Sequence, residues 1–440
     1  MAGKMREVAF QQLIDEGLLE IGDGYRAQNK ELGGTGPIFL RAGHVSDSHI
    51  DLAGVEHFHE HLADKVRSKM SQSGDTMITT KGNSTGRTAF VSDRLPPFVY
   101  WPHLSYWRSR DPEKLCGGFL RYWSRGVEFQ SQLSGMKAST DMAPYLSLTD
   151  QRRLTITLSR PAEQKAIAAV LGALDDKIEL NRRMNATLEA MARALFQSWF
   201  VDFDPVRAKR EGRQPTGLDA KAAALFPAGL EKTPLGQTPQ GWEVRSLDKI
   251  ADYLNGLALQ KYPPGDGPTL PVIKIAQLRK GDTVGADRCN TDLPPEHMIQ
   301  DGDVLFSWSG SLEVELWCGG SGALNQHLFK VTSPEFPKWF YYLWTLHHLE
   351  GFRAIAADKA TTMGHIQRGH LTAAKVLVPP PDLLKAMTRI MAPVIELIIA
   401  NRTQSRTLAT LRDALLPKLL SGELRALTAS GSMEAAMQLR

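Results

Sequence analysis

Between residues 161 and 205 the apolar positions recur with alternating spacings of four and three. The apolar members of this series are Ile167, Leu171, Leu174, Ile178, Leu188, Ala192, Leu195 and Trp199. This alternation is typical of a coiled-coil seam. Two positions of the same seam are polar, Asn181 and Asn185, and a buried Asn fixes the register of a helix pair at some cost in stability. We therefore expect a long helix over 161–205, stopped by Pro205, that faces a partner helix rather than a globular core.

The same pattern returns 220 residues later, beginning at Pro381. Pro161 aligns with Pro381, and Asn181 with Asn401. The second seam comprises Met387, Met391, Val394, Ile398, Asn401, Ser405, Leu408, Arg412, Leu415 and Leu419. Any two amphipathic helices share Leu and Ala, but Pro, Lys and an Asn-Arg pair shared at one offset indicate a duplication. The two helices are predicted to form an antiparallel coiled coil within one chain.

The segments before each helix have β-type alternation interrupted by Gly and Asn turns, together with short helical stretches. The predicted fold class is therefore α+β, with two mixed α/β domains, two long helices and a pseudo-two-fold internal repeat. The predicted parts are a first domain (1–160), a central helix (161–205), a linker rich in Pro and Gly (206–241), a second domain (242–380), a C-terminal helix (381–425) and a flexible tail (426–440).

The composition is ordinary for a globular protein and excludes little. The chain has 440 residues, a net charge of +4 and three cysteines, which allows two to four domains and a nucleic-acid partner without requiring one. Neither a signal-peptide core nor an apolar run of membrane-spanning length is present, so we expect no membrane association and a cytoplasmic location with reduced thiols.

The sequence offers no convincing catalytic or metal site. His57 and His61 would share a face if they lay on one helix, but no third ligand accompanies them, and a solvated or DNA-facing surface is favoured. Residues 95–98 superficially resemble the Asn-Pro-Pro-Tyr loop of amino-methyltransferases, yet Leu95 cannot accept the target amine. Residues 111–114 look faintly like nuclease carboxylates, although a charged turn explains them better. A phosphate-binding Walker loop is also missing, so we predict a binding protein.

Polar residues in the turns of both domains can contact DNA, since Arg and Asn suit base edges and Lys, Ser and Thr suit phosphates. The candidates are Lys81, Asn83, Ser84 and Arg87 in the first domain and Ser309, Ser311, Asn325, Gln326, Lys359, Thr361, Thr362, His365, Gln367 and Arg368 in the second. Polar loops alone are weak support. Two related domains held apart by helices of about 50 Å would, however, present two recognition surfaces along a duplex.

The central helix carries EQ-x-x-I at 163–167, Asn181 with Arg182, and SWFVDFDP at 198–205. In these motifs it resembles a known family, the specificity subunits of Type I restriction–modification systems. The ending LPKLLSGELR (416–425) and the segments GDVLFSWSGS (302–311) and GALNQHLFKV (322–331) are also similar to family patterns. The second helix departs at its start, where Pro-Asp-Leu-Leu replaces Pro-Ala-Glu-Gln.

The resemblance implies a non-catalytic subunit with two target-recognition domains, each reading one half of a bipartite double-stranded DNA target. It implies docking of two adenine-methyltransferase subunits on the helices and the addition of restriction motor/nuclease subunits. S-adenosylmethionine, ATP and magnesium would then belong to these partners, with no cofactor in this chain. A subunit of a methylation-only system would have the same sequence, and a helical scaffold that binds proteins is the alternative of another class. The target sequence is not readable from the chain.

Overall fold

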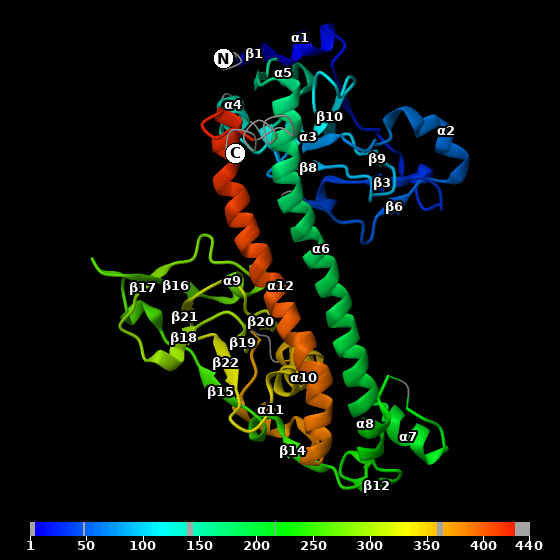
Figure 1. Cartoon of the computed structure of the whole chain (residues 1–440), viewed down its shortest axis with the longest axis vertical. Helices are drawn as coiled ribbons and strands as arrows, with labels where there is room; N and C mark the ends of the chain where they lie inside the picture. Colours follow the sequence, from blue (N-terminus) through cyan, green and yellow to red (C-terminus); the bar gives the residue numbers. More distant parts are fainter. Residues whose placement is uncertain (1–4, 47–48, 139–143, 216, 359–363, 427–440) are drawn as a thin grey trace, which may run out of the picture. The chain divides into compact units, whose positions relative to one another are not determined.

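The structure, a computed structural model, describes residues 5–46, 49–138, 144–215, 217–358 and 364–426. The chain divides into two compact units (Figure 1). Unit 1 contains Met1–Asp176 and Leu408–Arg440, and unit 2 contains Lys177–Thr407. Each unit therefore combines one α/β region with a part of each long helix. Within the described residues, none of the helices is both long and apolar enough to span a membrane.

Two helices of forty residues or more run from one unit into the other: α6 (Pro161–Phe200) and α12 (Pro381–Ser421). In unit 2, Asn185 of α6 contacts Ile398 of α12, whereas Asn181, one turn earlier in α6, contacts Gln404, further along α12. The two helices are thus antiparallel, as predicted. The mixed helix–strand fold class with an intramolecular helix pair is confirmed.

The first helix ends at the start of the predicted segment 200–205, but Pro205 is not the residue that stops it. Helix α6 ends at Phe200, and Phe203 adopts the left-handed backbone conformation with a positive φ of 55°. Pro205 instead lies in the first turn of α7 (Asp204–Arg210). A proline is tolerated at that position because its missing N–H has no partner in a first turn.

The heptad seam packs against globular cores as well as against its partner helix, which corrects the sequence interpretation. In unit 1, Ile167 and Leu171 share one hydrophobic cluster with Phe119 and with Leu419 of α12. In unit 2, Trp199 belongs to the core that also contains α10 (Lys338–Asp358), a helix rich in aromatic residues. An apolar stripe does not specify what covers it, and here the α/β regions cover part of it.

Unit 1 is built on a four-stranded sheet of order β2-β10-β7-β8 and a three-stranded sheet of order β6-β3-β9. Its elements are β1 (Arg6–Ala9), α1 (Phe10–Asp15), β2 (Leu19–Asp23), β3 (Ile38–Leu40), β4 (Val45–Ser46), β5 (His49–Ile50), β6 (Glu56–His57), α2 (Ala63–Val66), β7 (Thr76–Thr79), β8 (Thr88–Phe90), β9 (Phe98–Tyr100), β10 (Leu104–Ser109), α3 (Gly117–Trp123), α4 (Val127–Ala138), α5 (Leu148–Arg152) and β11 (Thr155–Leu158).

Unit 2 is built on sheets of order β15-β22-β19-β20 and β17-β16-β21-β18. Beyond α7 its elements are α8 (Ala220–Leu225), β12 (Leu230–Thr233), β13 (Gly236–Pro239), β14 (Glu243–Ser246), β15 (Asp252–Asn255), β16 (Thr269–Ile273), α9 (Ile275–Lys280), β17 (Arg288–Asn290), β18 (Met298–Ile299), β19 (Val304–Ser307), β20 (Val314–Leu316), β21 (Gly322–Leu324), β22 (Leu328–Thr332), α10 (Lys338–Asp358), α11 (Arg368–Ala373) and β23 (Lys375–Val378).

The two units repeat one topology. The strand order β2-β10-β7-β8 corresponds to β15-β22-β19-β20, and the parallel pair β3–β9 corresponds to β16–β21. In each unit the first strand pairs antiparallel with the strand directly before the long helix, β1 with β11 and β14 with β23. The internal repeat predicted from the helices therefore extends to the α/β regions.

Candidate nucleic-acid interface

In unit 2, polar and aromatic side chains gather where β19 ends. Ser309 lies two residues beyond the strand, and its Oγ is 3.0 Å from Nδ1 of His327. The backbone of Ser309 forms an isolated bridge with His365. The Trp308 ring lies 5.9 Å from the His327 ring and 6.4 Å from the His365 ring. Hydroxyl, imidazole and indole groups are thus presented together at one strand end.

Further polar residues fix this surface. Trp308 Nε1 donates to Asn255 Oδ1 at 3.0 Å, which holds the indole in place. Asn325 is buried and accepts from the backbone N–H of His327 at 3.3 Å, so its side chain braces the turn. Gln326 Nε2 lies 3.4 Å from His327 Nε2. The partly exposed Trp308, Gln326 and His327 therefore rest on a hydrogen-bonded support rather than on a loose loop, and Ser309 itself is buried.

Unit 1 has a corresponding surface with different side chains. The N–H of Thr80 bonds to His103 O at 2.9 Å, as the N–H of Trp308 bonds to His327 O in unit 2. Lys81 forms a bridge with Tyr145, as Ser309 does with His365. The pKa of His103 is lowered by burial and by the nearby Lys81 and Arg26 charges. The charges of Lys81 and Arg26 therefore lie close to His103 on this surface.

The predicted DNA-binding residues separate into groups. Lys81, Asn83, Ser84 and Arg87 share the loop from β7 to β8. Ser309, Asn325, Gln326 and His365 come together around His327, and Ser311 is exposed in the loop after Ser309. Gln367 and Arg368 are exposed at the start of α11. Lys359, Thr361 and Thr362 lie outside the described residues.

Two of these residues have contacts that a sequence could not reveal. Arg368 Nη2 donates to Tyr253 O at 3.1 Å, and its guanidinium lies 5.5 Å from the centre of the Phe329 ring. The N–H of Arg87 bonds to Thr79 Oγ1, and its carbonyl accepts from the N–H of Thr79. Arg87 is therefore held by its backbone at a defined position in the loop.

The polar seam residues meet in unit 2. Asn401 Nδ2 donates to Asn185 Oδ1 at 2.9 Å, and Asn185 Nδ2 donates to Ile398 O at 3.1 Å. Asn181 Nδ2 donates to Gln404 Oε1 at 2.8 Å and lies 3.3 Å from Ser405 Oγ. All three asparagines are buried. Such a network satisfies polar groups in only one alignment of the helices.

Each unit also has a cluster of charged residues at the helices. In unit 1, Asp175 of α6 accepts from Arg121 at 2.5 Å, from Arg125 at 3.1 Å and from Arg412 of α12 at 2.6 Å. Burial alone would raise the pKa of Asp175, but these three guanidinium groups lower it. Asp175 thus serves three arginines, of which Arg412 also pairs with Asp413 at 2.7 Å.

In unit 2 the roles are reversed. Arg402 of α12 lies 2.8 Å from Glu189 of α6 and 3.2 Å from Glu315 of β20. Burial raises the pKa of Glu315, although Arg402 opposes this shift. One guanidinium thus joins two carboxylates, so the two clusters differ in the sign of their charge excess.

The residues that resembled metal-binding or nuclease motifs in the sequence do not form such sites in the described part of the chain. His57 lies in β6 and His61 in a short 3₁₀ turn, so the two rings do not share a helix face. Asp111 and Lys114 form an ion pair of 3.2 Å within a turn, as expected for a charged turn. Among the described residues, His, Cys, Asp and Glu form no group of three that could hold a metal ion.

Sequence reasoning missed the aromatic residues of the candidate interface. Trp308, Trp101 and the exposed Tyr145 were not among the candidates, because aromatic residues in strand-rich segments usually belong to a core. Trp101 and Trp308 each follow a strand directly, and that position was the available signal, whereas Tyr145 lies in an isolated bridge with Lys81. Two similar sheet-end surfaces in one chain, with paired long helices, define a two-module binding protein.

The comparisons with known proteins specify this class. The chain is 27% identical over 291 residues to the Type I restriction enzyme MjaIX specificity subunit of Methanocaldococcus jannaschii, a match that spans 64% of this chain and 63% of that relative, less than two thirds of its length. It is 23% identical over 406 residues to the Type I restriction enzyme HindI specificity subunit of Haemophilus influenzae, spanning 81% of this chain and 88% of that relative. No protein-family profile matches the chain.

A solved structure, the Type I restriction–modification S subunit from M. genitalium, shares the fold. It superposes with a TM-score of 0.57 at 13% identity and covers 95% of this chain and 96% of its own. At this identity the likeness concerns the fold alone. Together with the two relatives, it confirms the resemblance to Type I specificity subunits that the central helix predicts.

Proposed function

We propose that this chain is the non-catalytic DNA-specificity subunit of a Type I restriction–modification complex. The observation that carries the proposal is the pair of equivalent strand-end surfaces, one per unit, in a chain similar to specificity subunits. Each surface would read one half of a bipartite double-stranded DNA target. Because the two surfaces differ in nearly every side chain, the two half-sites would differ in sequence.

The chemistry of the surfaces suits base recognition. Gln326, which is partly exposed, can exchange hydrogen bonds with base edges in the major groove, whereas the exposed Lys81 suits a phosphate or a guanine. His327 and Asn325 would orient these groups rather than contact bases, since they bond to the turn that presents them. Direct readout requires this kind of fixed donor and acceptor geometry.

The long helices would carry the partners and set the spacing. Several large apolar side chains on them are between 41% and 49% exposed: Val170, Leu180, Met191, Leu397 and Leu411. Exposed apolar residues of this size favour a docking role, here for two adenine-methyltransferase subunits. A 40-residue helix is about 60 Å long, which would separate the two half-sites by a defined number of base pairs.

Methylation and cleavage would then be activities of the assembled complex. Adenine methylation needs S-adenosylmethionine, and cleavage of unmodified DNA needs motor/nuclease subunits with ATP and magnesium, all of which the partners would supply. A methylation-only complex would use this chain in the same way. A DNA partner and three unpaired cysteines are consistent with the cytoplasmic location expected from the sequence.

The deciding experiment is methylome sequencing of cells that express this chain with a cognate methyltransferase, with and without the gene for this chain. We expect a bipartite adenine-methylation motif that disappears when the gene is deleted. Methylation that persists unchanged after deletion would contradict the proposed function. In that case protein partners of the helices should be sought instead, because a scaffold would be the remaining interpretation.

A further inference from the structure

Each unit presents one tryptophan and one histidine side by side at its strand-end surface. In unit 1 the ring centres of Trp101 and His103 are 4.4 Å apart, and the rings meet edge to face. In unit 2 the ring centres of Trp308 and His327 are 5.9 Å apart, and the rings are tilted by 41°. All four side chains are partly exposed, so a ligand can reach the aromatic pair of each unit.

The two histidines occupy equivalent backbone positions. His103 O accepts from the N–H of Thr80 in unit 1, and His327 O accepts from the N–H of Trp308 in unit 2. Trp308 therefore stands where unit 1 has Thr80, a buried residue without a ring. The tryptophan of unit 2 thus comes from a position that is not aromatic in unit 1.

The tryptophan of unit 1 follows a different strand. Trp101 comes directly after β9, and its equivalent in unit 2 is Asn325, directly after β21. A glycine marks this equivalence, because a Cβ on Gly24 would lie 2.1 Å from Trp101 O. A Cβ on Gly256 would likewise lie 2.2 Å from Asn325 O. Duplication alone would place the tryptophan at one position in both units, so its arrival from two different strands favours a function at the surface over inherited packing.

The indole of Trp308 is fixed in place. Its Nε1 donates to Asn255 Oδ1 at 3.0 Å. Its ring centre lies 5.9 Å from that of His327, 6.0 Å from that of Phe329 and 6.4 Å from that of His365. A wedge that enters the base stack has to project freely from the surface, and this side chain does not. A fixed, partly exposed indole instead offers an apolar surface at a set position.

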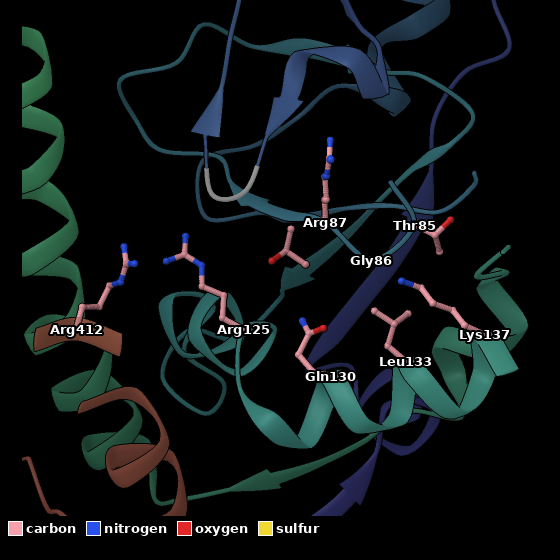
Figure 2. Close-up of a pocket in the computed structure, with 9 residues that line it drawn as sticks. Thr85, Gly86, Arg87, Arg125, Gln130, Leu133, Lys137 and Arg412 are labelled. Atoms are coloured by element: carbon pink, nitrogen blue, oxygen red, sulfur yellow. The ribbon is translucent and has the colours of Figure 1, made fainter. Parts of the chain in front are cut away.

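The pair in unit 1 lies beside a loop that is also held in position. Burial and the nearby Lys81 charge lower the pKa of His103, so the ring beside Trp101 is uncharged near neutral pH. The β7–β8 loop that carries Lys81 and the helix α4 are walls of a pocket of about 390 Å³. Figure 2 shows Leu133 of α4 pointing toward this loop at Gly86. The loop therefore rests on a helix.

The charges near the two pairs differ, unlike the aromatic rings. The N–H of Thr79 bonds to Arg87 O, and the N–H of Ser307 bonds to Glu313 O, both at 2.9 Å. Arg87 and Glu313 therefore occupy matching backbone positions with opposite charges. A cation and an anion suit different contacts with DNA, so the aromatic pair is the element that the two surfaces share.

We propose that the tryptophan of each pair, Trp101 in unit 1 and Trp308 in unit 2, contacts the C5 methyl group of a thymine in its half-site. The inference rests on the proposed function, since it takes a bipartite DNA target as the ligand. Thymine alone presents a methyl group in the major groove, where apolar side chains read it. In unit 2, the partly exposed Gln326 beside His327 suits the adenine of the same or the adjacent base pair. Each half-site would thus contain an A·T pair at a fixed position.

The test uses the full chain with its methyltransferase partners and a duplex that carries the target found by methylome sequencing. Each thymine of both half-sites is replaced in turn by deoxyuridine, which removes only the C5 methyl group. Affinity is measured by fluorescence anisotropy for the wild type, for Trp308→Ala and for Trp101→Ala, with thermal melting as the folding control. The two variants control each other, because each removes the same side chain from a different unit.

We expect one deoxyuridine in each half-site to weaken wild-type binding by about three- to fivefold, the effect of one buried methyl group. Trp308→Ala should remove this sensitivity in one half-site and keep it in the other, and Trp101→Ala should do the reverse. The inference would be overturned by a wild type that tolerates every deoxyuridine, or by variants that remove the sensitivity from the same half-site or from neither.

A measurement on the wild type keeps the test decisive if a variant melts early. The sensitive thymine is replaced by 5-iododeoxyuridine, which places a photoreactive iodine where the methyl group was. Ultraviolet light should crosslink one half-site to Trp308 and the other to Trp101, as read by mass spectrometry of the peptides. Crosslinks to other residues alone would show that neither tryptophan lies at the methyl group.

A scrambled duplex separates the two possible failures. If the wild type binds the target and the scrambled duplex equally, the proposed function fails. If it prefers the target but tolerates every deoxyuridine, the proposed function stands and only the role of the tryptophans is wrong.

Discussion

At the scale of single residues, the buried asparagines show how a helix pair can be specified by polar groups. Asn185 and Asn401 satisfy each other across the pair, whereas Oδ1 of Asn181 is buried without a partner among the described residues. An unsatisfied buried acceptor costs about 1–3 kcal/mol. These residues therefore select one alignment of the helices at the expense of stability.

We expect Asn401→Leu and Asn185→Leu each to lower the free energy of unfolding by about 1–3 kcal/mol, because each leaves a buried polar partner unsatisfied. The double substitution should cost less than the sum of the two, since it leaves neither group stranded. Urea denaturation of the four proteins measures this coupling. Strict additivity would show that the 2.9 Å contact between the two side chains contributes nothing.

Asp175 predicts a defined dependence of stability on pH. Its pKa is lowered in the folded chain, so its stabilising effect is complete above the unfolded value of about 3.9 and is lost as the pH falls through the lower folded value. Asp175→Asn should lower the free energy of unfolding by about 3 kcal/mol near neutral pH, because three guanidinium groups lose their shared acceptor. This difference from the wild type should shrink below about pH 4.

The control for that experiment is Asp176→Asn, one residue further along α6. Asp176 is 67% exposed and lies 3.7 Å from Arg94, so its loss should change stability little at any pH. Denaturation curves from pH 3 to pH 7, about the range over which a carboxylate titrates, compare the two variants. A difference between Asp175→Asn and the wild type that stays constant down to pH 3 would contradict the assignment.

At the scale of elements, the contact between the β7–β8 loop and α4 depends on a glycine. Gly86 has a φ of +92°, and a Cβ placed on it would lie 2.1 Å from Cδ2 of Leu133. A side chain at this position is opposed both by the backbone conformation and by the helix. The loop and α4 can therefore approach closely enough to form the walls of one pocket.

We expect Gly86→Ala to lower the stability of the chain by about 1–3 kcal/mol, because the positive φ and the close contact act together. Gly135→Ala on α4 is the control: it faces open space in a helix and should raise stability by up to about 1 kcal/mol. Differential scanning calorimetry distinguishes the two. A melting temperature of Gly86→Ala equal to that of the wild type would show that the loop relaxes freely.

The elements also show what a sequence can predict. The long helices were predictable because a heptad pattern continues over about forty residues in each, and because Asn181 recurs as Asn401 at the same place in the pattern. The end of the first helix was not predictable, because a proline such as Pro205 can either stop one helix or lie in the first turn of the next. The cluster around Asp175 was also beyond reach, because Arg121, Arg125 and Arg412 come from α3, from the turn after it and from α12, and no spacing links them.

At the scale of the whole molecule, the proposed function makes the length of the helices a determinant of specificity. Inserting one heptad into both α6 and α12 adds about 10 Å to each, the length of about three base pairs. We expect the methylated motif to gain about three base pairs between unchanged half-sites, read by methylome sequencing. Seven residues inserted in the exposed turn between β12 and β13 should leave the motif as it is.

The candidate interface was predictable only in part at this scale. Loops after strands pointed to Lys81 and Ser309, because polar residues follow buried strands there. The equivalence of the two surfaces could be recognised only once the strand pairing in both units was known. The same holds for the finding that Arg87 and Glu313 occupy matching backbone positions with opposite charges. These equivalences depend on which residues pair between neighbouring strands. The alternation of apolar and polar side chains in such short strands does not determine that pairing.

The exchange of Arg87 for Glu313 between matching positions has a kinetic consequence. Under the proposed function, attraction to phosphates governs the encounter during a search along unspecific DNA, and unit 1 has a cation, Arg87, where unit 2 has an anion, Glu313. Unit 1 would then capture the duplex first and unit 2 would inspect its half-site afterwards. The complex would dissociate quickly from a DNA site with mismatches in the half-site of unit 1. It would stay bound for a long time, without a productive outcome, at a site with mismatches in the half-site of unit 2.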